Sequence, residues 1–446
     1  MTTTSATLRR DFGGDIIEPG DDRYAAASGT VLAAGSPAYV LRPTDVGDVQ
    51  AGIAFAREQG LALAVRGGGH GFAGFGTNAD GVVLDLTGLD SVEVVDEERN
   101  IVRIGGGATW GQVADALGPL GLAISAGDTR SVGVGGLTLT GGIGWKVRKH
   151  GLALDNVVAV EVVTGTGEVL RASGEENAEL FWAIRGGGGN FGVVTAFEFL
   201  AHPTTDVHFG TLSFPAAEAA TVLAGWAEYF RDAPEGVTSN VVLANPFLGG
   251  PEAPVQVLVA YDGDDADEAT RALAPLRALG TVLQDDITRK PYGDILEEGM
   301  VPPPGIEFLT RSGFADADSA PKVLQILAES AATAGSPIIG LRSVGGAVSR
   351  VPDDATAYAH RDAALMFVTT SVGPRPAIDA ARPRMAELWE SLGPHVSGAY
   401  ANFLSGATAE DVAAVYPVQT YRRLAAVKHR YDPDNLFAGN LNVRPQ

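Results

Sequence analysis

The 446-residue chain contains no cysteine. This absence excludes disulfide bonds, thiolate metal sites and cysteinyl links to a cofactor, so any covalent anchor must be another residue. Basic residues are also scarce, with 32 Lys and Arg against 54 Asp and Glu, and the formal net charge of −22 is spread without blocks of like charge. We therefore expect a soluble protein whose partners include neither nucleic acid nor an anionic membrane.

Long apolar runs are missing as well. No run approaches the roughly 18 residues of a membrane span, and the opening residues MTTTSATLRRDFGGD lack the apolar core of a signal peptide. A cytoplasmic location is therefore expected. The seven histidines lie far apart, without metal-ligand spacing, and Walker A, HExxH and EF-hand patterns are absent. Metal chemistry is not expected.

Glycine, in contrast, is abundant. The 58 glycines cluster around residues 67–76, 105–111, 133–144, 186–192 and 345–346, and four of these five clusters precede residue 193. In the first cluster an apolar run ends at Arg66, three glycines follow, and His70 stands between two glycines. Glycines after a buried strand let backbone N–H groups approach phosphates or a large planar cofactor, and His70 is the one nucleophilic side chain among them. The alternative is a glycine-rich turn with an incidental surface histidine.

Two windows match GxGxxG, at Gly69–Gly74 and Gly187–Gly192. A dinucleotide-binding fingerprint requires a strand before the motif and a helix after it. The first window is followed by a turn and a strand, and the second lies between a helix and a strand. A nicotinamide-dinucleotide site is therefore not favoured.

The length predicts about two domains. In the first region, apolar patterns predict strands at 39–42, 61–66, 82–86, 91–95, 101–104, 157–164, 168–172 and 193–200. Thr44 is the expected N-cap of a helix that ends near Gly60, while Thr109 with Gln112 and Ser173 with Glu176 are expected capping boxes. Residues 127–151 contain too many glycines for a helix, so an extended, cofactor-covering loop is expected there.

Beyond residue 203 the pattern changes. Alternating segments predict strands at 207–214, 237–244, 255–261, 365–371 and 396–403, and helices are expected near 216–230, 266–279, 320–333 and 376–391. This pattern indicates a second α+β domain, in which helices cover an antiparallel sheet.

Five motifs in sequence resemble one family, the FAD-linked oxidases of the vanillyl-alcohol-oxidase type, in their berberine-bridge-enzyme-like branch. They are RGGGHG at 66–71, GGATWG around Trp110, the glycines of 127–144, RGGGGNFGVV at 185–194, and YDPDNLF at 431–437 with Asn440. The resemblance implies an α+β fold with a two-part FAD-binding domain, residues 1–203 plus a C-terminal segment 406–446, and an inserted substrate-binding domain, residues 204–405.

The resemblance also implies the cofactor and its contacts. His70 matches the histidine that the family joins covalently to the flavin 8α-methyl, and Thr129 stands where many relatives have a second, cysteinyl link, so attachment is expected through His70 alone. Val134 occupies a position where a small side chain is thought to leave an oxygen path, which favours an oxidase over a dehydrogenase. The expected FAD-binding residues are Arg66, Gly67, Gly68, Gly69, His70, Gly71, Gly127, Thr129, Gly133, Val134, Gly136, Gly142, Val194 and Asn440.

The expected catalytic residues are Tyr400, Asn402 and Arg342. Tyr400 and Asn402 resemble the family's Tyr-x-Asn motif, with Tyr400 as the base, and Arg342 is a cation that lowers the phenol pKa. Relatives often carry an acid at the Arg342 position, which puts a berberine-bridge-type mechanism in doubt. In the alternative interpretation, Tyr400 is a core tyrosine and Arg342 is an ion-pair partner on the surface.

The expected activity is hydride transfer from an alcohol or amine carbon of a small organic or secondary-metabolite substrate to covalent FAD, with reoxidation by O₂ to hydrogen peroxide. Two alternatives stay open: an oligosaccharide oxidase on the same scaffold, and a flavin-binding protein without catalysis. The oligomeric state cannot be read from the sequence.

Overall fold

The computed structural model describes residue 8 and residues 10–446. Its first sheet has the order β1–β2–β4–β3 (Asp15–Ile17, Tyr39–Arg42, Val82–Asp85 and Leu63–Arg66), in which β2, β4 and β3 are parallel. The helix α3 (Val46–Gln59) makes the crossover from β2 to β3, which lie parallel on either side of β4. Its N-cap is Asp45, whose carboxylate accepts a hydrogen bond from the Asp48 N–H. The predicted cap at Thr44 is therefore wrong by one residue, and the Thr44 hydroxyl instead donates to the Asp48 carboxylate.

The second sheet is antiparallel and has the order β5–β6–β10–β8–β9 (Val92–Asp96, Ile101–Gly105, Val193–Leu200, Val157–Val163 and Val169–Ser173), close to the predicted strands. The capping box of Thr109 and Gln112 is confirmed at the start of α4 (Trp110–Leu117). The second predicted box is wrong, because α7 (Ala178–Gly187) begins after Asn177, which has positive φ and no side-chain cap. The Ser173 hydroxyl accepts from Glu175 and Glu176 N–H in the turn before that helix.

Residues 127–151 are not one extended loop. They contain α5 (Val134–Thr140) and α6 (Val147–His150). Glycine is needed in α5 for close packing, since a Cβ on Gly135 would lie 2.8 Å from the Gly106 carbonyl oxygen. The helix ends where Gly141 and Gly142 take φ of 150° and 93°, which few other residues adopt. The prediction failed because it took these packing and C-terminal glycines for loop residues.

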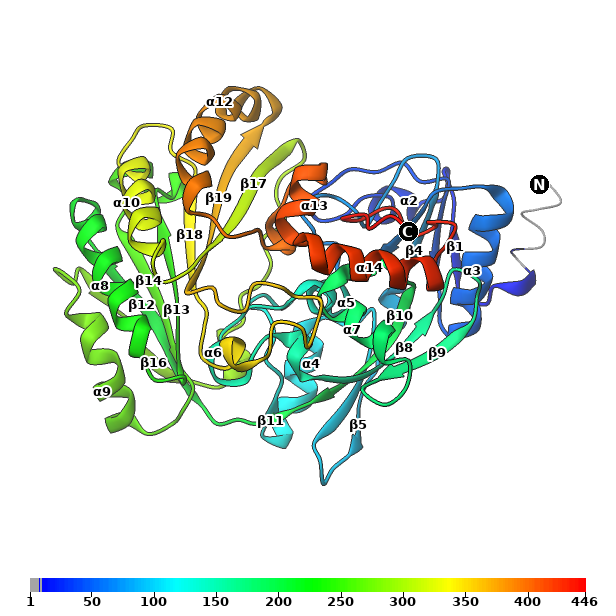
Figure 1. The fold of residues 1–446 in the computed structure, drawn as a ribbon, viewed down its shortest axis with the longest axis horizontal. Coiled ribbons are helices and arrows are strands. Elements are labelled where there is room, and N and C mark those ends of the chain that lie inside the picture. The colour runs from blue at the N-terminus through cyan, green and yellow to red at the C-terminus, as the bar shows by residue number, and fades with distance from the viewer. Residues whose placement is uncertain (1–7, 9) are drawn as a thin grey trace.

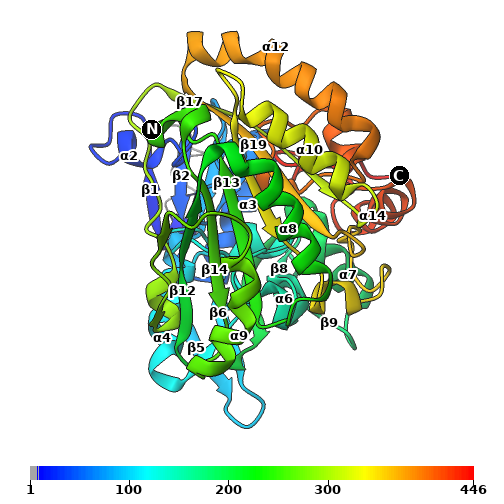
Figure 2. The ribbon, with the colours of Figure 1, turned by 90° about the vertical axis from the view of Figure 1, so that its left-hand side faces the viewer.

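The third large sheet is antiparallel, with the order β15–β12–β14–β13–β18–β19–β17 and β16 beside β12. Its strands are Gln284–Asp285, Val207–Phe214, Val255–Tyr261, Val237–Leu243, Ile338–Ser343, Leu365–Pro374, Ile306–Ala315 and Thr288–Lys290. Its outer face is covered by α8, α9, α10 and α12 (Ala219–Asp232, Ala266–Arg277, Ala320–Ala331 and Arg375–Leu392), as Figures 1 and 2 show. The predicted α+β fold is therefore confirmed.

One predicted strand of this sheet is absent. Residues 396–403 form an isolated bridge between Gly398 and Phe314, followed by a 3-10 turn at Ala401–Phe403. This turn carries Tyr400 and Asn402 out of the sheet, toward α5. The short elements are α2 (Tyr24–Ala27), β7 (Leu122–Ala123), β11 (His202–Pro203) and α11 (Ala347–Arg350).

The C-terminal segment returns to the N-terminal part through α13 (Ala409–Val415) and α14 (Val418–Tyr431), and α14 packs on α7 (Figure 1). The buried side chain of Lys428 holds this C-terminal segment against the N-terminal part. Lys428 Nζ donates to the carbonyl oxygens of Asn190 and Phe437 at 2.7 and 3.1 Å, and to the Asp432 carboxylate at 2.5 Å. The domain boundaries at 203 and 405 stay a prediction.

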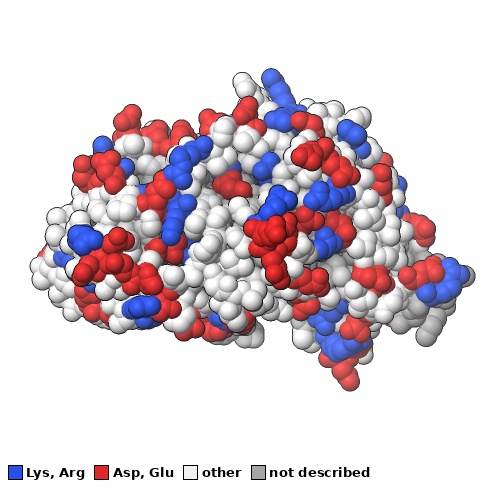
Figure 3. All heavy atoms as spheres, turned by 90° about the horizontal axis from the view of Figure 1, so that it is seen from below, with Lys and Arg blue, Asp and Glu red and all other residues white. Residues whose placement is uncertain are grey.

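The surface carries the acidic excess without one continuous patch of either sign on the face in Figure 3, where Lys and Arg lie among Asp and Glu. None of the helices in the described part of the chain combines the length and apolar composition that a membrane span needs. Over residues 8 and 10–446, no three His, Asp or Glu side chains are grouped as a metal site.

Candidate functional site

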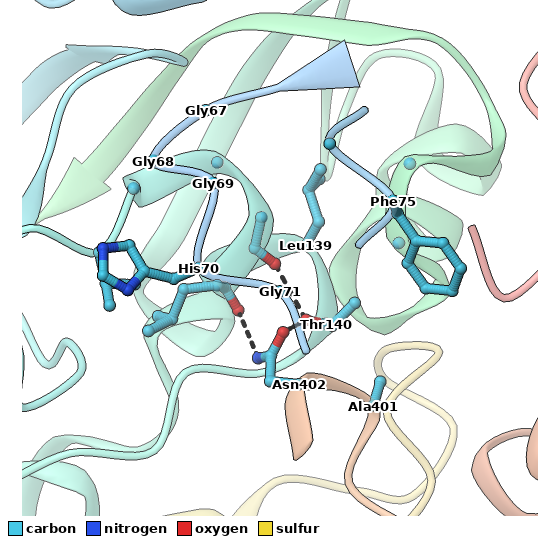
Figure 4. Close-up of a pocket in the computed structure, with 18 of the residues that line it drawn as sticks. Gly67, Gly68, Gly69, His70, Gly71, Phe75, Leu139, Thr140, Ala401 and Asn402 are labelled. Carbon is cyan, nitrogen blue, oxygen red and sulfur yellow. Dashed lines mark hydrogen bonds between the residues drawn. The ribbon is translucent and has the colours of Figure 1, made fainter. Parts of the chain in front are cut away.

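A cavity of about 560 Å³ lies where the glycine-rich segments meet the large antiparallel sheet and the C-terminal segment. Figure 4 shows one end of it, with Gly67–Gly71 on one side and Thr140 and Asn402 on the other. The structure brings most of the predicted site residues to its wall: Arg66, Gly67, Gly68, Gly69, His70, Gly71, Gly127, Thr129, Gly133, Gly136, Val194, Arg342, Tyr400, Asn402 and Asn440.

Two predicted cofactor contacts do not line the cavity. Val134 is fully buried in a hydrophobic core, so its side chain faces away from the site. Gly142 instead donates its N–H to the Tyr400 phenol oxygen at 2.9 Å. Arg66 reaches the wall, but its guanidinium donates to the Gly29 and Ala27 carbonyl oxygens and to Asp85 at 2.7 to 3.0 Å. Arg66 therefore holds the loop in place rather than offering a free cation.

The loop after β3 packs backbone to backbone on the segment before α5. A Cβ on Gly68 would lie 2.3 Å from the Gly133 nitrogen, so neither glycine can be replaced without separating the two segments. This contact presents His70 at the cavity wall, on the opposite side of the drawn site from Phe75 (Figure 4). Burial lowers the pKa of His70, and a hydrogen bond with the Ser131 backbone opposes that shift. Its imidazole is neutral at physiological pH, as a nucleophile must be.

The Tyr400 phenol oxygen is surrounded by N–H donors. Gly142 N, Ile143 N and Asn402 Nδ2 lie 2.9, 3.3 and 3.0 Å from it. A neutral phenol has two lone pairs and a proton to donate, whereas a phenolate accepts three hydrogen bonds without conflict. Burial raises the pKa of Tyr400, and the three donors and the charge of Arg342 lower it. Burial is the largest of these effects, so the pKa of Tyr400 lies above its ordinary value although the three donors favour a phenolate.

Arg342 extends from β18 and pairs with Asp128, at 2.6 Å between Nη1 and Oδ2. Its guanidinium also lies over the Phe403 ring, 5.4 Å from the ring centroid. Glu297 lines the same wall, and burial and the nearby Asp128 charge raise its pKa. Arg342 is an ion-pair partner, as the alternative expected, but it lies in the cavity wall rather than on the outer surface.

Several residues of the cavity wall were not predicted from the sequence. Phe72 packs edge-on against Phe308 at 5.8 Å and tilted against Phe403 at 5.9 Å, which forms an aromatic wall from three distant segments. Glu297 reaches the site because its segment bridges Thr129. Phe72 lies within the Gly69–Gly74 window and Phe403 follows Asn402, but only long-range contacts bring these residues together with Phe308 and Glu297.

Comparison with known proteins agrees with this geometry. A family model described as an FAD binding domain matches residues 37–173, and one described as berberine and berberine like matches residues 399–444. The first model covers the glycine segments up to residue 144 and the second covers the Tyr400 segment, and residues of both line the cavity.

Similar proteins match along nearly the whole chain. (R)-6-hydroxynicotine oxidase of Paenarthrobacter nicotinovorans is 33% identical over 464 residues, with 97% of each chain covered. The crystal structure of 6-hydroxy-D-nicotine oxidase from Arthrobacter nicotinovorans superposes with a TM-score of 0.86 at 30% identity, covering 98% of each chain. The xylooligosaccharide oxidase of Myceliophthora thermophila, in complex with xylobiose, gives a TM-score of 0.88 at 25% identity, covering 99% of each chain.

Proposed function

Because the chain belongs to the FAD-linked oxidases of the vanillyl-alcohol-oxidase type, in their berberine-bridge-enzyme-like branch, we propose that it oxidises an alcohol or amine carbon of a small organic molecule. It is an FAD-dependent oxidase. The observation that carries the proposal is the Tyr400 phenol, held by three N–H donors in the wall of a cavity that also contains His70.

The residues of the cavity fit FAD. Gly71, Gly136 and Gly189 line it with nothing within 4 Å of where a Cβ would stand, so backbone is open to a ligand there. The Tyr416 hydroxyl and the Asn440 side-chain oxygen line it too, buried and without a hydrogen-bond partner in the described part of the chain. Unpaired buried polar atoms are costly, so a polar ligand at this wall would satisfy them.

We propose that His70 forms the single covalent link, through its imidazole to the flavin 8α-methyl. The chain has no cysteine for a second link, and Thr129 stands at the wall without a thiol. When bound, FAD would accept the hydride of the substrate carbon, and O₂ would then take the electron pair and two protons and leave as hydrogen peroxide.

The remaining chemistry belongs to the protein. As the C–H bond of the substrate breaks, the Tyr400 phenolate takes the proton of the neighbouring O–H or N–H, so that a C=O or C=N bond forms and the phenol becomes neutral. The N–H groups of Gly142 and Ile143 and the amide of Asn402 hold the phenol oxygen in place. Phe72, Phe308 and Phe403 offer an apolar wall for the substrate.

The substrate assay separates this proposal from its alternatives. The flavin-loaded protein should form peroxide with members of a panel of small aromatic alcohols and cyclic amines, read in a peroxidase-coupled assay. Peroxide from xylo-oligosaccharides alone would favour the oligosaccharide oxidase, for which the similarity to the xylooligosaccharide oxidase is the support. If none of the tested substrates reduced the bound flavin or gave peroxide, the protein would be a flavin-binding protein without catalysis.

Substitution of Arg342 should shift the pH dependence. Because the phenolate is the active form of the base, kcat/KM should rise as the pH increases through the pKa of Tyr400, which burial raises. The Arg342 cation stabilises the phenolate, so Arg342→Met should move that rise to higher pH by roughly one unit. Arg342→Lys keeps the charge and should move it less. Equal profiles for the native and Met proteins would show that Arg342 does not tune the base.

A further inference from the structure

The amide of Asn402 has two possible orientations with opposite effects on Tyr400. In the observed one Nδ2 faces the phenol oxygen at 3.0 Å and donates to it. Rotation of the amide by half a turn would place Oδ1 there instead, where it would accept the proton of a neutral phenol and repel a phenolate. The groups that hold the orientation of the Asn402 amide therefore influence whether the phenol or the phenolate of Tyr400 is favoured.

Two groups contact the other side of that amide. The Leu137 carbonyl oxygen, which only accepts, lies 3.4 Å from Nδ2. The Thr140 hydroxyl lies 2.6 Å from Oδ1 and 2.9 Å from the Gly136 carbonyl oxygen. Thr140 has one proton, and the 2.6 Å separation of two oxygens requires that proton between them. The Thr140 hydroxyl thus donates to Asn402 Oδ1, as the contact in Figure 4 shows.

We propose that Thr140 is a positioning residue, whose hydroxyl holds the Asn402 amide with Nδ2 turned toward the Tyr400 oxygen and so favours the phenolate. Among the described residues the Thr140 hydroxyl contacts Gly136 and Asn402 and makes no hydrogen bond to the phenol, so it acts on Tyr400 through Asn402. It is the last residue of α5, and the glycine turn that follows delivers Gly142 N and Ile143 N to the same oxygen. One short segment therefore supplies or orients all three donors. The proposal rests on the proposed function only where Tyr400 is taken as the base.

Other groups near the phenol do not replace this role. Arg342 is the cation that acts on Tyr400, and it has its own carboxylate partner in Asp128. Tyr358 is the other titratable side chain that acts on it, and burial keeps the pKa of Tyr358 well above its usual value, so Tyr358 is neutral. Neither of them touches the Asn402 amide.

The test replaces the hydroxyl of Thr140 by a methyl group. Thr140→Val is nearly isosteric, leaves Oδ1 without its donor and frees the amide to rotate, so the pKa of Tyr400 should rise by roughly one unit. Thr140→Ser keeps the donor and should leave the pKa within a few tenths of the native value. The readout is ¹⁹F NMR of the purified holoprotein labelled with difluorotyrosine, whose fluorines bring the phenol pKa into an accessible range, with Tyr400→Phe to assign the signal.

A double-mutant comparison excludes a merely structural role. In an Asn402→Leu background the amide is gone, so Thr140→Val should cause no further shift. An unchanged pKa in the single Thr140→Val variant, or the same shift with and without the amide, would overturn the proposal. The titration needs no turnover. If Tyr400→Phe kept full activity, the role of Tyr400 as base would fail while the titration still decided the role of Thr140.

Discussion

Replacing Tyr400 by Phe should lower kcat by about 10²- to 10⁴-fold, the usual contribution of a positioned general base. The substitution removes one oxygen from a cavity wall and leaves Gly142 N, Ile143 N and Asn402 Nδ2 without their shared acceptor. Substrate binding should change less than kcat, because Tyr400 is only 3% exposed and the substitution removes a single oxygen from the cavity wall. The rates are measured with the flavin content of each preparation matched.

The control is Tyr358→Phe. Tyr358 is also buried, and it does not line the cavity, so its loss should leave kcat near the native value. The free energy of unfolding should be measured for both variants, since unpaired buried N–H groups cost about 1 to 3 kcal/mol each. A stable Tyr400→Phe protein with full flavin and native kcat would show that another group takes the substrate proton.

Replacing Lys428 by Met should lower the free energy of unfolding by about 3 to 5 kcal/mol, the usual cost of breaking a buried ion pair. The side chain is fully buried, and its loss leaves the Asp432 carboxylate without its cation and the Asn190 carbonyl oxygen without its lysine donor, while the Phe437 carbonyl oxygen keeps Asn440 Nδ2. Chemical denaturation read by far-UV circular dichroism measures the change. Because Lys428 joins Asn190 to the C-terminal segment that carries Asn440 to the cavity, flavin incorporation should fall as well.

The matched control lies on the same helix. Arg422 is exposed on α14, so Arg422→Met should change the free energy of unfolding by less than about 0.5 kcal/mol. If Lys428→Met were no less stable than Arg422→Met, the C-terminal segment would be held by its apolar contacts, and the buried cation would contribute nothing.

The sequence predicted the fold best where a local rule decides the structure. Three such features depend only on neighbours within a few residues. They are the strand Val157–Val163 with its hairpin partner, the capping box at Thr109 and the strand before His70. The grouping of His70, Tyr400 and Asn440 at one cavity came from the family resemblance, since His70 lies 330 positions before Tyr400 and no local pattern joins the three.

The failures have a common physical cause, which is tertiary contact. Position 135 lies in the helix α5, and it is occupied by glycine because the neighbouring backbone leaves no room for a side chain. Glycine spacing alone suggested a loop. The segment 396–403 alternates like a strand but turns out of the sheet, so that Tyr400 and Asn402 can meet α5. Val134 is buried in a hydrophobic core and does not line the cavity, so its contact with the cofactor stays a prediction. Glu297 and the aromatic wall come together only when the chain folds.

The central claim is that His70 carries the flavin, and acid precipitation of the purified protein tests it most directly. The native pellet should stay yellow, with the flavin absorbance retained after washing, because a histidyl bond survives denaturation. The pellet of His70→Ala should be colourless and the flavin should appear in the supernatant. Colour in both pellets would contradict His70 as the anchor, and a folded native protein that takes up no FAD at all would contradict the account as a whole.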